Sequence, residues 1–268
     1  MKKELLSETI LRNRNRIIDL VYFGKAGHPG GALSIIDVLT YIYMLEVDLA
    51  SQNRTRVVMS KGHAVAAQYA CLMEKGAIKE EEIVTFRTID SRLQGHPHTV
   101  SVPEVDATTG LLGQGLSIGV GMAFAKRLKN DRSKVYVIIG DGELNEGQNW
   151  ESILQAAQFN LKNIIMIVDY NRLSSSGDVN QVLNLEPLGD KFKAFNWETI
   201  EIDGHDLDQI YSTFDYIGRN QNRPIALIAK TVKGKGVSFM ENNPAWHSGT
   251  INDDQYAQAK KDLMGESL

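Results

Sequence analysis

The stretch VIIGDGELNEG, residues 137–147, places a carboxylate between two glycines at the end of an apolar run. Asp141 is that carboxylate, and neither neighbour carries a side chain. A tight turn is the simplest interpretation of Gly-Asp-Gly, because both residue types are common in turns. The second interpretation is a cation held by Asp141 together with a phosphate group, since a helix-like pattern follows directly and helix N-termini favour phosphate.

A second polar residue, Asn171, ends the apolar segment NIIMIVDYN, 30 positions after Asp141. This spacing equals about one helix plus one strand, so the two side chains can face each other from neighbouring strand ends. A carboxylate and an amide oxygen suit Mg²⁺, which completes its shell with water and substrate phosphates. A backbone carbonyl near Leu173 could supply a third protein oxygen, and the amides from Gly142 onward could meet the phosphate. The sequence therefore predicts a metal-bridged diphosphate site.

The helices that must surround such a site are indicated by hydrophobic periodicity. Four segments each place apolar residues on one face of a 3.6-residue period. These faces are Ile10, Ile17, Ile18 and Val21; Ile35, Leu39 and Ile42; Leu116, Val120, Ala123, Phe124 and Leu128; and Trp150, Ile153, Leu154 and Ala157.

Strands are indicated by RVVM and by four later runs, KVYVIIG, NIIMIVD, WETIEID and PIALIAKTV. The later runs are continuously apolar or β-branched, as expected of strands buried on both faces. Strand, helix and strand at this spacing form a parallel unit with a right-handed crossover. We therefore expect an α/β fold, a doubly wound and mostly parallel sheet with helices on both faces. No linker or repeat divides the chain, so residues 1–268 are expected to form one domain.

Composition excludes several classes of function. The net charge is −4 and no long basic run occurs, which argues against nucleic-acid binding. The single cysteine, Cys71, excludes an intrachain disulfide and a thiolate-rich zinc site, and its apolar context predicts a buried thiol. No apolar run approaches the roughly 20 residues that span a bilayer. Acidic residues interrupt the N-terminal segment, so no secretory signal is expected and a cytoplasmic location is the default.

The motif GDGELNEG followed by DYN resembles the thiamine-diphosphate motif. The chain as a whole is similar to the N-terminal, diphosphate-binding half of transketolase, with matching blocks over about residues 20 to 250. In order, these blocks are AGHPGGALS, MSKGHA, LQGHPH, TTGLLGQGLSIGVGMA, GDGELNEG, DYN and WHSG. The resemblance implies the thiamine-diphosphate-binding fold, and thiamine diphosphate with Mg²⁺, or Ca²⁺ or Mn²⁺ in its place, as cofactors.

The resemblance also implies roles for four histidines. His28 and His63 match residues around the thiazolium and diphosphate, and His96 matches a residue that contacts sugar hydroxyls. His247 matches one near the diphosphate and the reacting centre. Histidine suits these tasks because it donates hydrogen bonds and exchanges protons near neutral pH. His98 and His205 match no useful position, and His205 is expected to be a turn residue before a helix that Asp206 caps.

Further positions follow from the same resemblance. The expected metal ligands are Asp141, Asn171 and Leu173, and the cofactor contacts add Gly110, Leu112 and Gly142. The backbone at Gly110 and Leu112 is expected to meet the aminopyrimidine. Glu146 matches a carboxylate network at the subunit interface of the family. Lysines 230, 233 and 235 are expected to mark a solvated strand end rather than a phosphate clamp, and SKGH and NRLSSSG depart from the family pattern.

A usual transketolase is more than twice as long, and its second domain supplies the glutamate that protonates the pyrimidine. The resemblance therefore implies a separate C-terminal subunit carrying the pyrimidine-binding domain, in an α2β2 assembly. The implied reaction transfers a two-carbon ketol unit from a ketose phosphate to an aldose phosphate. Alternatives are a subunit like 1-deoxy-xylulose-phosphate synthase or a 2-oxo-acid dehydrogenase, a specialised branched or sulfonated sugar substrate, and a non-catalytic, cofactor-binding regulatory subunit. Nucleotide binding is disfavoured, because no Gly-x-Gly-x-x-Gly follows an early strand.

Overall fold

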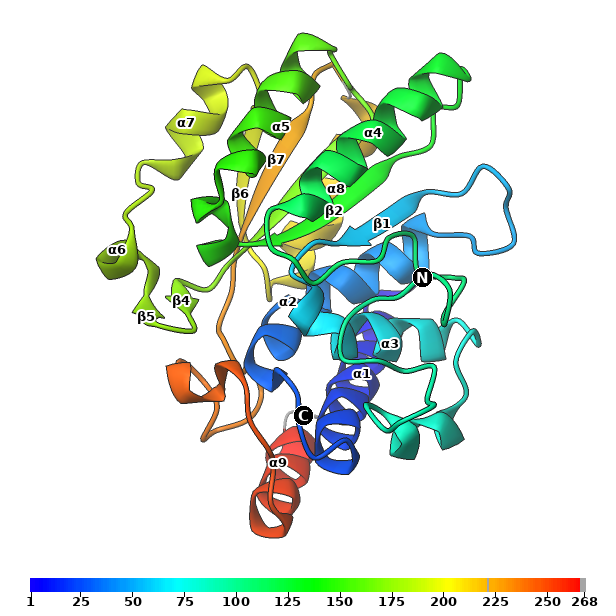
Figure 1. Ribbon diagram of the computed structural model, residues 1–268, viewed down its shortest axis with the longest axis vertical. Helices are drawn as coiled ribbons and strands as arrows, with labels where there is room; N and C mark the ends of the chain where they lie inside the picture. Colours follow the sequence, from blue (N-terminus) through cyan, green and yellow to red (C-terminus); the bar gives the residue numbers. More distant parts are fainter. Residues whose placement is uncertain (221, 266–268) are drawn as a thin grey trace.

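The computed structural model describes residues 1–220 and 222–265, arranged around a twisted parallel sheet (Figure 1). Within these residues the main sheet has five strands in the order β1-β2-β3-β7-β6, and every neighbouring pair is parallel. The strands are β1 (Arg56–Met59), β2 (Val135–Gly140), β3 (Ile164–Tyr170), β6 (Glu198–Asp203) and β7 (Ile225–Lys230). The short strands β4 (Leu173–Ser174) and β5 (Gly177–Asp178) form a separate antiparallel pair.

Helices cover both faces of the sheet because alternate strand residues point to opposite sides. On one face, Val137, Met166 and Ala226 pack with the helices α4 (Gln114–Leu128), α5 (Gly147–Gln158) and α7 (Leu188–Ala194). On the other face, Ile138, Ile167 and Leu227 pack with α1 (Lys3–Phe23), α2 (Pro29–Tyr41), α3 (Val65–Glu74) and α8 (Leu207–Arg219). The predicted doubly wound α/β architecture is thus confirmed.

Shorter elements connect these layers. A π-helical turn (Ile42–Glu46) extends α2, and 3-10 turns occupy Gly62–Ala64, Glu80–Thr85, Gly142–Asn145 and Pro244–His247. The helix α6 (Val179–Val182) follows β5, and α9 (Asp253–Gly265) packs beside α1 at the bottom of Figure 1. Tyr22 and Tyr256 stack there with ring centroids 4.0 Å apart.

Two predicted helix faces are partly wrong. Leu128 is 67% exposed and Leu154 is 54% exposed. The buried residues of α5 are Asn149, Ser152, Ile153 and Ala156, a face rotated by about one position from the predicted one. The polar Asn149 and Ser152 were overlooked because periodicity searches follow apolar residues only. The other two predicted faces, on α1 and on α2 with its π-helical extension, are confirmed. Their predicted residues are all buried: Ile10, Ile17, Ile18, Val21, Ile35, Leu39 and Ile42.

The segment WETIEID was predicted as a strand buried on both faces, and this is wrong in one respect. It forms β6, but β6 is an edge strand paired only with β7, and Glu198 and Glu201 are not buried. The two glutamates already distinguish it from the other runs, since edge strands tolerate charge. Cys71 is fully buried as predicted, and burial raises the pKa of its thiol to about 12. No helix among the described residues is long and apolar enough to cross a membrane.

Candidate active site at the carboxyl ends of the strands

The candidate metal ligands follow two adjacent strand ends. Asp141 comes directly after β2 and Asn171 directly after β3, and these strands pair in register, with Gly140 opposite Asp169. The Asp141 side chain accepts hydrogen bonds from the backbone N–H of Gly142 at 2.7 Å and of Arg172 at 2.5 Å. The Asn171 Oδ1 accepts one from the N–H of Leu173 at 3.1 Å. The three predicted ligands therefore lie on two short loops, residues 141–142 and 171–173, that hydrogen bonds join into one loop system.

The oxygen atoms of this loop system fit a hard divalent cation. Asp141 is buried, and burial followed by the nearby charge of Asp169 raises its pKa to about 6. The Asp141 carboxylate accepts only from backbone N–H groups and forms no direct ion pair within the described residues, so Mg²⁺ would supply a countercharge in contact with it. No cluster of three or more His, Cys, Asp or Glu side chains in the described residues could hold a metal. The proposed site needs no such cluster, because its protein ligands are one carboxylate, one amide oxygen and one backbone carbonyl.

The four predicted histidines converge next to this loop system, from four separate segments. His28 precedes α2, His63 lies in the turn Gly62–Ala64, and His247 ends the turn Pro244–His247. The ring centroid of His28 is 5.1 Å from that of His63, 5.6 Å from that of His247 and 6.4 Å from that of His96. His63 and His247 are 5.0 Å apart. Histidines distant in sequence thus form one cluster.

These histidines are neutral at pH 7. Burial, followed by the charges of neighbouring groups, lowers the pKa of His28 and of His247 to about 4. Burial and then Lys61 lower the pKa of His63 well below its ordinary value, and burial and Arg87 lower that of His96. The Nδ1 atom of His28 is buried and has no hydrogen-bond partner within the described residues. A buried ring nitrogen without a partner fits a ligand that supplies one.

The remaining predicted positions lie at the rim of the cluster. Gly110 has φ +145°, and a Cβ atom there would lie 3.0 Å from Cδ2 of His96. Glycine permits both this backbone conformation and the close approach. Gly142 begins the turn after Asp141. Leu112 and Glu146 are exposed at the N-terminal ends of α4 and α5, so the structure brings them to the edge of the site and not into its centre.

Lys233 was predicted to be solvated, and this is wrong. The side chain is 2% exposed, and its Nζ donates to the carbonyl of Leu173 at 2.6 Å and lies 3.3 Å from Nδ1 of His247. Burial and Lys61 lower the pKa of Lys233 to about 8. The reason is tertiary: the N–H of Gly234 donates to the carbonyl of Gly30, which holds this loop against α2. Lys230 and Lys235 are more accessible, as expected.

The two excluded histidines lie elsewhere. His98 bonds to Ser101 Oγ at 2.7 Å within its own loop. His205 precedes α8, which Asp206 caps as predicted. The His205 ring also makes contacts with distant segments, which was not predicted. Its Nδ1 contacts Asp37 of α2 at 2.5 Å, and its Nε2 accepts from the N–H of Val232 at 2.9 Å. His205 therefore joins α2 to the loop after β7.

Several residues of the site were not predicted from the sequence. Glu143 is buried and accepts hydrogen bonds from Ser60 Oγ at 2.5 Å, from the N–H of Gly113 at 3.0 Å and from that of Gly140 at 3.2 Å. It ties the end of β2 to the start of α4. Lys61 and Asp169 form a buried ion pair beneath the loop. The departure SKGH was the available signal for Lys61, whereas Glu143 resembles an ordinary first-turn glutamate.

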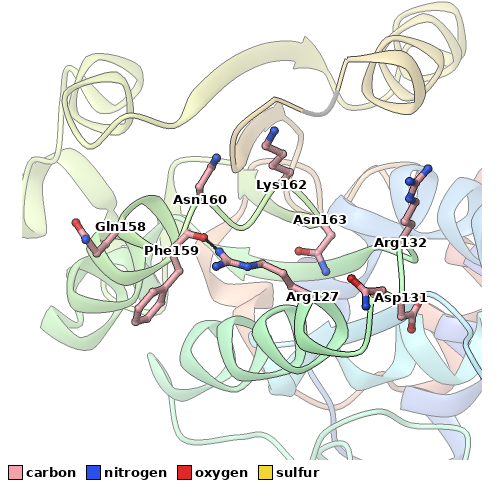
Figure 2. A pocket seen from close by; sticks show the side chains of 9 residues that line it. Arg127, Asp131, Arg132, Gln158, Phe159, Asn160, Lys162 and Asn163 are labelled. Carbon is pink, nitrogen blue, oxygen red and sulfur yellow. Dashed lines mark hydrogen bonds between the residues drawn. The ribbon is translucent and has the colours of Figure 1, made fainter.

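Two concavities flank the molecule at opposite ends of the sheet. One, of about 450 Å³, lies beside His96 and is lined by the segments around Gly95 and Thr109. A larger one, of about 880 Å³, lies beyond the C-terminal ends of α4 and α5 (Figure 2). There Arg127 donates to the carbonyl of Phe159, and Lys126 pairs with Asp131. The larger concavity contains none of the residues predicted for the site.

Comparisons with known proteins point to one family. A family model described as "Transketolase, thiamine diphosphate binding domain" matches residues 7–266. The chain is 41% identical over 268 residues to one subunit of the apulose-4-phosphate transketolase of Phocaeicola vulgatus, covering 98% of this chain and 95% of that relative. It is 38% identical to the 6-deoxy-6-sulfo-D-fructose transketolase subunit SqwG of Clostridium sp. (strain MSTE9), covering 94% of each.

Solved structures of similar fold are longer proteins. The transketolase of Campylobacter jejuni superposes with a TM-score of 0.91 at 32% identity, and that of Leishmania mexicana with 0.89 at 27%. The match covers 98% and 97% of this chain but only 43% and 41% of those chains. The chain thus spans about two fifths of the solved proteins that it resembles.

Proposed function

This chain belongs to the transketolase family as a thiamine-diphosphate-binding subunit, and we propose that residues 1–268 form a single domain holding the diphosphate side of the cofactor. Like the separate transketolase subunits that it matches over nearly their whole length, it acts in ketol transfer with a partner subunit. The observation that carries the residue assignments is the convergence of Asp141, Asn171, Leu173 and four neutral histidines at one edge of the sheet.

The cofactor side of the site divides into two groups of residues. Asp141, Asn171 and the carbonyl of Leu173 would hold Mg²⁺, with Ca²⁺ or Mn²⁺ as substitutes. The diphosphate would contact Gly142, Asn171, His63 and His247. The backbone at Gly110 and Leu112 would approach the aminopyrimidine, and Glu146 would face the partner. Thiamine diphosphate, when bound, supplies the electron sink for cleaving the bond next to a ketose carbonyl.

The histidines would act on the sugar. Because their pKa values are lowered, His28, His63, His96 and His247 are neutral imidazoles that can both donate and accept hydrogen bonds. They would orient substrate hydroxyls and exchange protons with them. His96 borders the smaller concavity, and a sugar would reach the cluster from this side. Arg87, an exposed cation whose charge acts on His28 and His96, lies against Gly95 of the same concavity.

We propose a ketose phosphate donor and an aldose phosphate acceptor, in a reaction of pentose phosphate metabolism in the cytoplasm. Two relatives are named for apulose 4-phosphate and for 6-deoxy-6-sulfo-D-fructose, so a branched or sulfonated sugar is a second candidate substrate. Neither of these relatives is named as a 1-deoxy-xylulose-phosphate synthase or a 2-oxo-acid dehydrogenase.

The partner is proposed to cover the N-terminal ends and outer faces of α4 and α5. Residues 114–125 of α4 contain no charged residue, although Gly121 and Ala125 are exposed. The exposed Leu111 and Leu154 extend this uncharged surface. It is continuous with Leu112 and Glu146 at the rim of the site, so a protein that completes the cofactor site must contact it. The proposed occupant is a C-terminal transketolase subunit, in an α2β2 assembly.

A ketol-transfer assay tests this function. It uses xylulose 5-phosphate and ribose 5-phosphate with thiamine diphosphate and Mg²⁺, and compares this chain alone with this chain plus the product of the neighbouring reading frame. Activity is expected only in the mixture. Substantial activity of the single chain would contradict the two-subunit proposal. A cofactor-bound complex that is inactive with these sugars and with branched and sulfonated ketoses would favour a non-catalytic, regulatory subunit.

A further inference from the structure

Two carboxylates, not one, lie at the strand ends beside the proposed metal position. Asp141 follows β2, and Asp169 lies near the end of β3, opposite Gly140. The N–H of Asp141 donates to the carbonyl of Asp169 at 3.3 Å, and both side chains are buried. If both carboxylates were available beside the amide of Asn171 and the carbonyl of Leu173, the oxygen set would suit a divalent cation without a phosphate.

Lys61 contacts only one of the two carboxylates. Its side chain is 2% exposed, and its Nζ donates to Oδ2 of Asp169 and to the carbonyl of Gly31, the latter at 2.9 Å. Its stem passes the end of β2, where a Cβ on Gly140 would lie 4.0 Å from that of Lys61. The Lys61 ammonium therefore compensates the negative charge of the Asp169 carboxylate.

The other contacts of Asp169 also use up its acceptor capacity. Ser34 and Asn171 donate to its Oδ2, the latter through Nδ2 at 3.2 Å, and Thr231 donates to its Oδ1 at 2.5 Å. The bond from Asn171 fixes which way the amide points and leaves the amide oxygen toward the loop of Leu173. Asp141, in contrast, has no lysine, arginine or histidine within ion-pair distance in the described residues.

We propose that Lys61 is a built-in cation that withdraws Asp169 from the metal site, so that a divalent cation binds strongly only together with a diphosphate. This inference rests on the metal assignment proposed above and names how that site is regulated. With Lys61 present, Asp141 is the one carboxylate that remains for the cation, and a phosphate must supply the remaining charge. The site then does not fill with metal before the cofactor arrives. Lys61 is a positioning residue in this scheme.

The test is a titration of the full chain with Mn²⁺, followed by its paramagnetic signal, with and without inorganic pyrophosphate. The parent is expected to bind Mn²⁺ weakly alone and tightly with pyrophosphate. Lys61→Met frees the carboxylate of Asp169, so Mn²⁺ alone is expected to bind at least about tenfold more tightly than to the parent. The double variant Lys61→Met/Asp169→Asn removes both charges and should regain the dependence on pyrophosphate.

Two controls separate this effect from damage to the fold. Lys126→Met breaks another nearly buried pair, with Asp131, at the far end of the sheet and should leave Mn²⁺ binding unchanged. Lys61→Met leaves a buried charge unpaired, which is strongly destabilising. If this variant does not fold alone, the proposal requires that Mn²⁺ restores its folding, whereas the double variant folds without metal.

Each remaining outcome counts for or against the proposal. If Lys61→Met is folded and binds Mn²⁺ no more tightly than the parent, or is unfolded and Mn²⁺ does not rescue it, the role of Lys61 is refuted. Failure of the parent to bind Mn²⁺ even with pyrophosphate or thiamine diphosphate would refute the metal assignment itself. The metal assignment would also be refuted if an Asp141→Ala variant bound Mn²⁺ and thiamine diphosphate as tightly as the parent. The two failures are therefore distinguishable.

Discussion

At the scale of single residues, the most unusual property of the site is a group of imidazoles that resists protonation. His28, His63 and His247 are partly buried and His96 is more exposed, and the nearby cations Lys61, Lys233 and Arg87 add repulsion. A protonated histidine would carry a full charge into a site that must also accept a metal ion. Neutral rings avoid this cost and keep one donor and one acceptor each.

The lowered pKa values predict how stability depends on pH. His28 and His247 titrate near 4 in the folded chain, against an ordinary value of 6.5. Between these values the unfolded chain binds more protons, so the free energy of unfolding should fall as the pH falls through this window. The raised pKa values of Asp141, about 6 against 3.8, and of Glu143 act in the opposite direction, but these are two groups against four histidines.

Thermal denaturation at about pH 5 and about pH 7 measures this dependence. The cofactor-free parent should lose stability at the lower pH, by less than full burial would give because His28 and His247 are partly accessible. The double variant His28→Gln/His247→Gln should show a smaller loss. A control outside the cluster, His98→Gln, should leave the difference as it is in the parent. An unchanged pH dependence in the double variant would contradict the predicted protonation states.

At the scale of elements, the loop entering α4 joins backbone geometry to the site. Gly110 has a positive φ and approaches His96, and Gly113, the residue before α4, also has a positive φ of 82°. The N–H of Gly113 donates to Glu143, which itself binds the end of β2. The position of His96 thus depends on a loop whose shape requires glycine.

Gly110→Ala is expected to destabilise the chain by about 1–3 kcal/mol, because alanine strains this backbone conformation. It should also displace His96, since the new Cβ would lie 3.0 Å from the ring. Denaturant unfolding measures the first effect, and the KM of the ketose donor in the assembled enzyme measures the second. Gly218→Ala in α8 is the matched control. No atom lies within 4 Å of its new Cβ, and a gain of roughly 0.5–1 kcal/mol is expected there. Equal behaviour of the two variants would refute the assignment.

At the scale of the whole molecule, the residues of this chain surround only one side of the proposed cofactor site. The chain covers about two fifths of the solved transketolases that it resembles but nearly all of the separate transketolase subunits that it matches. Leu112 and Glu146 are exposed at the rim, next to the surface formed by the uncharged residues 114–125 of α4 and by Leu154 of α5. Figure 1 shows these two helices side by side on one face of the sheet, as an interaction surface requires.

Leu154→Lys is expected to weaken association with the partner subunit, because it replaces an exposed apolar side chain of this surface by a charged one. Leu154 is already exposed in the chain, so the free energy of unfolding should change little. Sedimentation of the mixed subunits measures the association. Val182→Lys, at an exposed position on α6 away from this surface, should associate like the parent. If Leu154→Lys also associates like the parent, the partner binds elsewhere.

Local patterns were sufficient to predict much of the protein. Hydrophobic periodicity indicated the helices and strands, and the spacing of Asp141 and Asn171 placed them at adjacent strand ends, because parallel strands end at a common edge. The blocks of residues that resemble transketolase named the four histidines that the structure brings together. These features are local, or follow from the order of elements along the chain.

What the sequence could not determine depends on contacts between distant segments. Lys61 meets Asp169 across 108 positions, Ser34 meets Asp169 across 135, and Lys233 meets Leu173 across 60. A lysine after a strand is usually solvated, so only the packing of the loop against α2 reveals that Lys233 is buried. Burial then sets the charges and pKa values of the site, because desolvation depends on every element that surrounds a group. The sequence determined which elements and candidate ligands are present, and the tertiary structure decided which charges are neutralised.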